Sequence, residues 1–169
     1  MKINHTIILI VIISIFGACT MPSSESSTPN PFFSESPLYL KYPPFDKIKN
    51  EHYAPAFELG MKQHMQEIDS IALDQDLASF ENTILAMEKA GSLLDRVSTV
   101  FYALTSAHTN DEMEKVRSEM APKLSAHNDK ILLNDALFQR INTLYANRMD
   151  LGLDNESVRL IEKYHTSFI

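Results

Sequence analysis

The stretch from Ser79 to His108 constrains this chain more than any other, because its apolar residues recur at helical spacing. The apolar positions are Phe80, Ile84, Met87, Leu94, Val97, Phe101 and Leu104. This spacing predicts one long helix with a single buried face, capped at its start by Ser79. Gly91 stands where one more apolar residue would fall. Because glycine costs a helix interior about 1 kcal/mol relative to alanine, we expect a kink or a close helix contact there.

Four further segments with helical spacing surround this stretch. The first runs from about His52 to Leu73, and residues 74–78 link it to the helix above. The other three are Met113 to Ile131 after a cap near Asn110, Leu137 to about Leu151-Gly152 after a turn at Asn134-Asp135, and a last helix capped by Asp154. Pro122 predicts a kink or a break near Met120. We therefore expect an all-α fold over residues 38–169, with five or six antiparallel helices in hairpins.

The charge balance argues against several kinds of partner. The 169 residues include 22 acidic and 15 basic side chains, which gives a formal net charge of −7. An acidic surface of this kind disfavours nucleic acid and electrostatic attraction to anionic lipid. The single cysteine, Cys19, rules out an intramolecular disulfide within this sequence.

Residues 1–18 have the pattern of an export signal. Lys2 is followed by an apolar run from Ile7 to Phe16 and then by the small residues Gly17 and Ala18. The apolar run is shorter than the roughly 20 residues that a transmembrane helix needs. A plain signal peptide and an uncleaved anchor are the alternatives to the interpretation that follows.

The small residues before Cys19 resemble a bacterial lipobox, the sequence at which lipoproteins are processed. The resemblance implies lipidation of Cys19 and export to the cell envelope, with an anchor in the outer membrane on its periplasmic side. Several acyl chains on one residue are enough for stable membrane anchoring. Residues 19–37 are rich in Ser and Pro and are predicted to be a solvated tether. Phe32 and Phe33 are the exceptions, and we expect both to dock onto the helical body.

The residues contain no pattern typical of a catalytic, cofactor-binding or metal site. The histidines of the predicted mature chain are His52, His64, His108, His127 and His165. No two of them are four residues apart, so the H-E-x-x-H pattern of zinc peptidases is absent. The paired carboxylates stand at predicted helix starts, where capping explains them, and the four glycines could hardly form a phosphate loop. We predict that these histidines are packing or surface residues.

Four strings resemble one family of enzymes, the zinc peptidyl-dipeptidases related to thimet oligopeptidase and oligopeptidase A. The strings are His52–Phe57 with Gly60-Met61, Phe80–Glu88, Ala107–Glu112, and Leu151–Asp154 with Glu156-Ser157 and Arg159-Leu160. They occur in the family's order between about Asn30 and Ile169. The resemblance implies that residues 38–169 are the N-terminal helical part of a larger, mostly helical metallopeptidase.

Such enzymes release dipeptides from the C-terminus of short peptides, and these N-terminal helices form one wall of the channel that admits them. Their zinc ion is bound late in the chain, so this segment alone is expected to be inactive. The running helical pattern at Ile169 suggests a fragment or a premature stop. Two alternatives remain at this point: a complete, non-catalytic helical lipoprotein that binds peptides or a partner protein, and a degenerate gene product without function.

Overall fold

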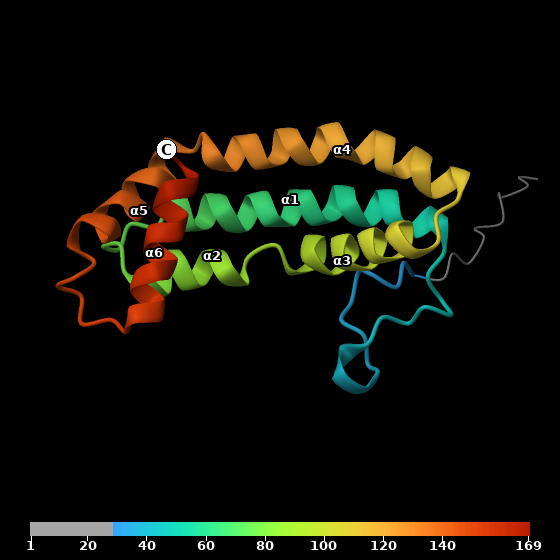
Figure 1. Cartoon of the computed structure of the whole chain (residues 1–169), viewed down its shortest axis with the longest axis horizontal. Helices are drawn as coiled ribbons and strands as arrows, with labels where there is room; N and C mark the ends of the chain where they lie inside the picture. Colours follow the sequence, from blue (N-terminus) through green and yellow to red (C-terminus); the bar gives the residue numbers. More distant parts are fainter. Residues whose placement is uncertain (1–28) are drawn as a thin grey trace, which may run out of the picture.

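Helix α1 lies at the centre of the computed structural model, which describes residues 29–169 (Figure 1). The α-helices are α1 (Tyr53–Ala72), α2 (Ala86–Lys89), α3 (Ser92–Ala107), α4 (Asp111–Leu132), α5 (Asp135–Asn147) and α6 (Asn155–Ser167). Two short 3-10 turns, η1 (Tyr39–Lys41) and η2 (Asn50–His52), precede α1, and a π-helical turn, η3 (Phe80–Leu85), precedes α2. These residues contain no strand, which confirms the all-α prediction.

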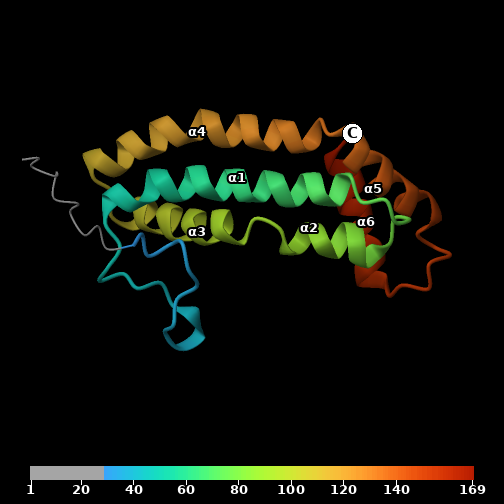
Figure 2. The same ribbon diagram turned by 180° about the vertical axis from the view of Figure 1, so that it is seen from behind.

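Helix α4 lies on one side of α1, and α2 and α3 lie on the other (Figures 1 and 2). The chain runs through α1 and α4 in the same direction and through α3 in the opposite direction. Thus α1 and α3 pack as an antiparallel hairpin, whereas α4 crosses over to pack on α1. Helices α5 and α6 close the end of the bundle where α1 finishes.

Two apolar clusters form the core. The first joins α1, α3 and the first part of α4 around Phe57 and Phe101, both of which are fully buried. The ring of Phe101 stands edge-on to Tyr53 and Phe57, with centroid distances of 5.0 and 5.3 Å. The second cluster joins the end of α1 to η3, α2, α5 and α6. Each helix therefore buries the face that its apolar spacing predicts.

The backbones of α1 and α3 approach closely at Gly60. A Cβ atom built on Gly60 would lie 2.9 Å from the Cα atom of Leu94. Real Cβ atoms do not come this near to a backbone atom, so only glycine permits this crossing without a shift of one helix. Gly60 belongs to the first of the four family strings, and its structural role is this helix contact.

The prediction of one continuous helix from Ser79 to His108 is wrong. Ser79 does cap the first part, since its Oγ accepts a hydrogen bond of 3.1 Å from the backbone N–H of Asn82. The helix then ends at Lys89, and α3 begins after Gly91, which has a left-handed φ of 76°. The Gly91 N–H donates a 2.6 Å bond to Glu67 Oε2 on α1. The helix is thus interrupted at Gly91, where the chain contacts α1 instead. This contact is the close helix contact expected at Gly91.

Replacing Gly91 by alanine should lower the free energy of unfolding by roughly 1–3 kcal/mol. The new Cβ would be strained at this φ and would lie 3.0–3.1 Å from the His64 ring. Urea unfolding followed by circular dichroism measures the loss. Gly152→Ala is the matched control for strain alone, because Gly152 also has a positive φ but its Cβ would meet no atom within 4 Å. An equal loss in both variants would contradict a role for the His64 contact.

Two other expected helix boundaries also differ from the structure. Of the kink or break predicted near Met120, the break does not occur: helix α4 continues through Pro122, and Figure 1 shows it as a single curved helix. Proline has no N–H, so Pro122 cannot donate a helical hydrogen bond to the carbonyl of Ser118. Both residues lie on the exposed face of α4, so water can bond to that carbonyl. Helix α5 ends at Asn147, before the predicted Leu151-Gly152. The guanidinium of Arg148 donates a 2.7 Å bond to the carbonyl of Tyr145 and thereby satisfies the helix end.

The remaining boundary signals agree with the sequence. Two side chains cap helices as expected, since Asn110 and Asp154 each accept a bond from the backbone N–H three residues on. Asn134, which the sequence predicts to lie in a turn, caps α5 in the same way. Phe32 docks as predicted and is 2% exposed, and Arg96 donates two hydrogen bonds to its carbonyl. Phe33 does not dock, since 47% of its surface is exposed.

Candidate functional site

The one site residue that the sequence predicts, the lipidation site Cys19, lies outside the described residues 29–169. The predicted export signal over residues 1–18 lies outside them too. Within residues 29–169, none of the helices has the length and apolar character needed to cross a lipid bilayer.

The histidines lie in four different surroundings. His52 precedes α1, and its Nδ1 accepts a 3.0 Å bond from the backbone N–H of Lys49. His108 is exposed at the end of α3, and His165 stacks on the ring of Tyr145 at a centroid distance of 3.8 Å. His64 and His127 lie together. Over residues 29–169, no three His, Cys, Asp or Glu side chains converge in a way that could hold a metal ion.

The pairing of His64 on α1 with His127 on α4 is not visible in the sequence, because 63 residues separate them. Their rings lie 5.0 Å apart, and His64 Nδ1 is 3.0 Å from His127 Nε2. One imidazole must therefore donate and the other accept, which two neutral rings can do and two cations cannot. Burial lowers the pKa of His64, although Glu67 partly opposes this shift. Burial, together with His64 and Lys130, lowers the pKa of His127.

The pair lies beside an open groove between α1 and α4. Its lining includes Met61, Lys62 and Met65 from α1, and Lys123 and Lys130 from α4. Lys123 is also bonded to Glu58 and Glu119, at 2.6 and 3.1 Å. The groove therefore offers apolar thioethers next to ammonium groups, which suits a peptide segment that carries carboxylates. The two imidazoles are bonded to each other, so the contact is one of packing and positioning.

The histidine pair predicts a loss of stability in acid. Both pKa values are lower in the folded chain than the ordinary value of about 6.5, so the unfolded chain binds protons first as the pH falls. Stability should be constant above pH ~7 and should fall below about 6.5, by up to about 1.4 kcal/mol per pH unit for each histidine. Urea unfolding at a series of pH values measures this. The double variant H64Q/H127Q should lose most of the slope, whereas H108Q should keep it; an unchanged slope in the double variant would contradict the pairing.

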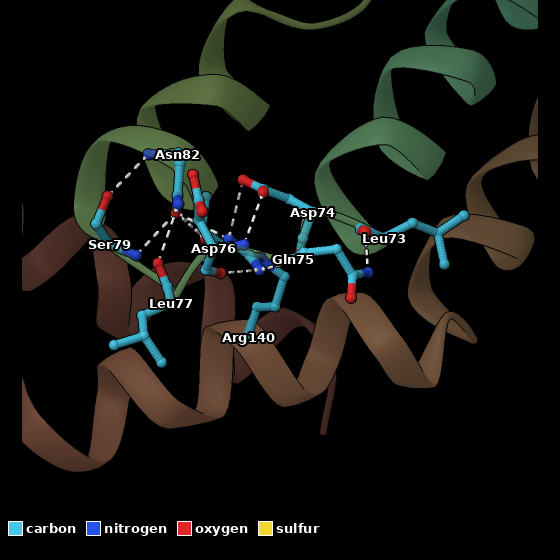
Figure 3. A network of polar contacts seen from close by, with 9 residues as sticks. Leu73, Asp74, Gln75, Asp76, Leu77, Ser79, Asn82 and Arg140 are labelled. Carbon is cyan, nitrogen blue, oxygen red and sulfur yellow. Dashed lines mark hydrogen bonds and ion pairs between the residues drawn. The ribbon is translucent and has the colours of Figure 1, made fainter.

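Arg140 on α5 makes the most extensive polar network, which sequence analysis missed (Figure 3). Its side chain is almost fully buried, and it donates to the carbonyls of Asp74 and Asp76 at 2.8 and 2.9 Å. It also donates to Asn82 Oδ1 at 2.9 Å and to Thr83 Oγ1 at 3.2 Å. The planar guanidinium thus fixes the link after α1 and the turn η3 to α5. The contact distances leave no open position for a ligand, so this network is structural.

Comparisons with known proteins test the resemblance to the peptidyl-dipeptidase family. No family model matches this chain. The chain is 46% identical over 143 residues to the dipeptidyl carboxypeptidase of Escherichia coli, and 43% identical over 140 residues to that of Salmonella typhimurium. The matches cover 85% and 83% of this chain. This chain is homologous to part of the dipeptidyl carboxypeptidases. The resemblance to peptidyl-dipeptidases is confirmed.

The chain spans only 21% of the length of these two dipeptidyl carboxypeptidases. The described helical bundle therefore corresponds to a small part of the chain of such a peptidase. Three contacts hold the helices of the bundle together: the Arg140 network, the Gly60 crossing and the Gly91 contact.

Proposed function

We propose that this chain is the helical N-terminal part of a zinc peptidyl-dipeptidase, in which it forms one wall of the channel that admits short peptides. The observation that carries this proposal is the 46% identity over 143 residues to the E. coli dipeptidyl carboxypeptidase. The open groove between α1 and α4, with its mixture of apolar and cationic side chains, supports a role in contact with peptides.

The described residues do not fit a zinc ion. A catalytic zinc site takes three protein ligands and keeps one position open. Residues 29–169 bring no such set of side chains together, and His64 and His127 are bonded to each other. The zinc that the family resemblance implies would have to be held by residues elsewhere in the enzyme, and the part of this chain is to shape the path of the substrate.

The cell envelope is the proposed location. The proposal rests on the export pattern of residues 1–18 and on the lipobox-like context of Cys19. Its substrates would then be periplasmic or imported short peptides. Radiolabelled palmitate in growing cells tests the anchor: the wild-type protein should carry the label and a Cys19→Ser variant should not.

A chimeric enzyme tests the proposed function. In the E. coli dipeptidyl carboxypeptidase, the region that matches this chain is exchanged for residues 29–169. We expect the chimera to release C-terminal dipeptides from short peptides, to lose this activity with a chelator and to regain it with zinc. Residues 29–169 alone, assayed in parallel, should release none. A folded chimera without any activity would overturn the proposal.

The alternative is a non-catalytic helical protein that binds peptides or a partner. The groove between α1 and α4 favours it as a second candidate, because the groove exists without any further residues. Isothermal titration of residues 29–169 with short acidic peptides distinguishes the two functions. Micromolar binding, together with an inactive chimera, would favour the alternative.

A further inference from the structure

A loop over residues 33–49 reaches away from the helical bundle at the end where α1 begins (Figures 1 and 2). We call it the projecting loop. Its outermost side chains are apolar and largely exposed: Tyr39 84%, Leu40 72%, Tyr42 60% and Phe45 53%. Several large apolar side chains exposed together on one short loop mark a place where another surface can pack. Nothing in the bundle covers these four side chains.

The projecting loop has a defined conformation that its own contacts hold. The N–H of Lys41 donates to the carbonyl of Leu38 at 2.8 Å, and its ammonium group binds Glu35 at 2.6 Å. At the base, Asn30 donates a 2.8 Å bond to the carbonyl of His52. The loop is thus preformed, which reduces the entropy that docking would cost.

Two residues at the tip of the loop are strained. Leu40 and Lys41 have left-handed φ angles of 52° and 58°, and neither is glycine. Such a conformation costs of the order of 1–3 kcal/mol, and it persists where surrounding contacts require it. The bundle provides no such contacts for the Leu40 side chain, which is 72% exposed. The contacts of Lys41 with Leu38 and Glu35 hold this strained turn, and the turn presents the Leu40 side chain to solvent.

A cavity of about 560 Å³ opens beside the exposed tip. Its lining includes Pro31, Pro37, Leu38 and Pro44 together with polar and charged residues such as Glu35, Asp46, Lys47 and His52. The projecting loop thus presents a convex apolar tip next to a concave pocket of mixed apolar and polar lining. A protein surface with its own projections and hollows can fill both shapes, whereas a flat lipid surface would meet the tip alone.

We propose that the projecting loop is the surface on which this helical part docks against the remainder of the peptidase. This inference rests on the proposed function. The matched dipeptidyl carboxypeptidases are about five times as long as the region that this chain matches, so most of such an enzyme lies beyond the bundle. The net charge of −7 offers no general attraction to anionic lipid, which leaves apolar packing against protein as the favoured contact.

Thiol labelling at the tip tests the docking. The variant L40C is made in residues 29–169 and in the chimera with the E. coli enzyme, and its modification by a maleimide is followed by mass spectrometry of the peptide that contains position 40. We expect labelling at least ten times slower in the chimera than in the free chain. Residues 29–169 contain no native cysteine, and S118C on the exposed face of α4 provides a reference rate in the free chain.

The outcomes separate the docking from the proposed function. An active chimera with equal labelling rates at position 40 would overturn the docking and leave the function intact. A folded but inactive chimera with slow labelling would support docking and overturn the function. Protection of the free chain by vesicles of phosphatidylethanolamine and phosphatidylglycerol, with none in the chimera, would assign the loop to a lipid surface and overturn the docking. Protection that rises with the concentration of the free chain would assign it to a second copy, with the same consequence.

A second substitution at position 40 tests whether docking of the projecting loop stabilises the chimera. L40Q should leave the melting temperature of residues 29–169 within about 1 °C of the parent value, because the side chain is exposed there and glutamine suits the left-handed φ no better than leucine does. The same substitution in the chimera should lower the melting temperature by several degrees, since it would place an amide in an apolar interface. Equal shifts in the two proteins would contradict a docked loop.

Discussion

Replacing Arg140 by leucine is expected to lower the free energy of unfolding of residues 29–169 by roughly 3–5 kcal/mol. The guanidinium is almost fully buried and binds five acceptors on the link after α1 and on η3, of which Asp74 Oδ2 at 3.5 Å is the most distant. Leucine would leave the carbonyls of Asp74 and Asp76 and the side chain of Asn82 without these donors. Urea unfolding followed by circular dichroism at 222 nm measures the change.

Two variants show whether the loss at Arg140 arises from its hydrogen bonds. Arg140→Lys keeps the charge but cannot reach five acceptors with one ammonium group, so it should also be destabilising. Arg159→Leu is the control for loss of an arginine at the exposed surface, and it should change stability by about 0.5 kcal/mol or less. If Arg140→Leu cost no more than Arg159→Leu, the network of Figure 3 would not hold the fold together.

Replacing Phe101 by alanine is expected to cost about 3–5 kcal/mol, because it opens a cavity at the centre of the first core cluster. The Phe101 ring is fully buried and stands edge-on to Tyr53 and Phe57. Domains of this size are stable by about 5–15 kcal/mol, so the variant should begin to unfold at a much lower urea concentration.

The neighbouring residue provides the control for Phe101. Tyr102 follows it on α3, but 44% of its surface is exposed. Tyr102→Ala should therefore destabilise the chain clearly less than Phe101→Ala. Similar losses at the two positions would mean that α3 does not bury the face that its sequence predicts.

Local signals in the sequence were enough for much of this fold. The predicted caps Ser79, Asn110 and Asp154 act within four residues of their own position, and the structure has each of them. Apolar spacing likewise identified the buried faces, because it depends on one helix at a time. The all-α architecture follows from these short-range patterns.

What the sequence did not predict depends on contacts between distant residues. The break at Gly91 arises from Glu67 and His64 on α1, 24 or more residues earlier. The Arg140 network joins residues 57–66 positions apart, and His64 meets His127 across 63 positions. No local pattern reports such pairs. The continuity of α4 through Pro122 depends on which face of the helix meets water, and this too is set by tertiary packing.

The family could be recognised from the sequence because four short strings are typical of it. The structural roles of the residues in these strings could not be predicted. Gly60 lies in the first family string, and the structure explains it by the contact with the backbone of Leu94. Asn82 and Thr83 lie in the second string, and both bind Arg140. These positions therefore have packing roles in this chain, and none of them needs to touch a substrate.

The size of the native product tests the central claim most directly. An antibody raised against residues 92–107 is used to probe whole cells and the membrane fraction. We expect a membrane-bound band about four times the mass of this 19.2 kDa chain, because the 143 matched residues are 21% of the E. coli relative, whereas the chain has 169 residues. Dipeptide release that depends on zinc should follow that band through purification. A band at or below 19.2 kDa, without peptidase activity, would contradict the account.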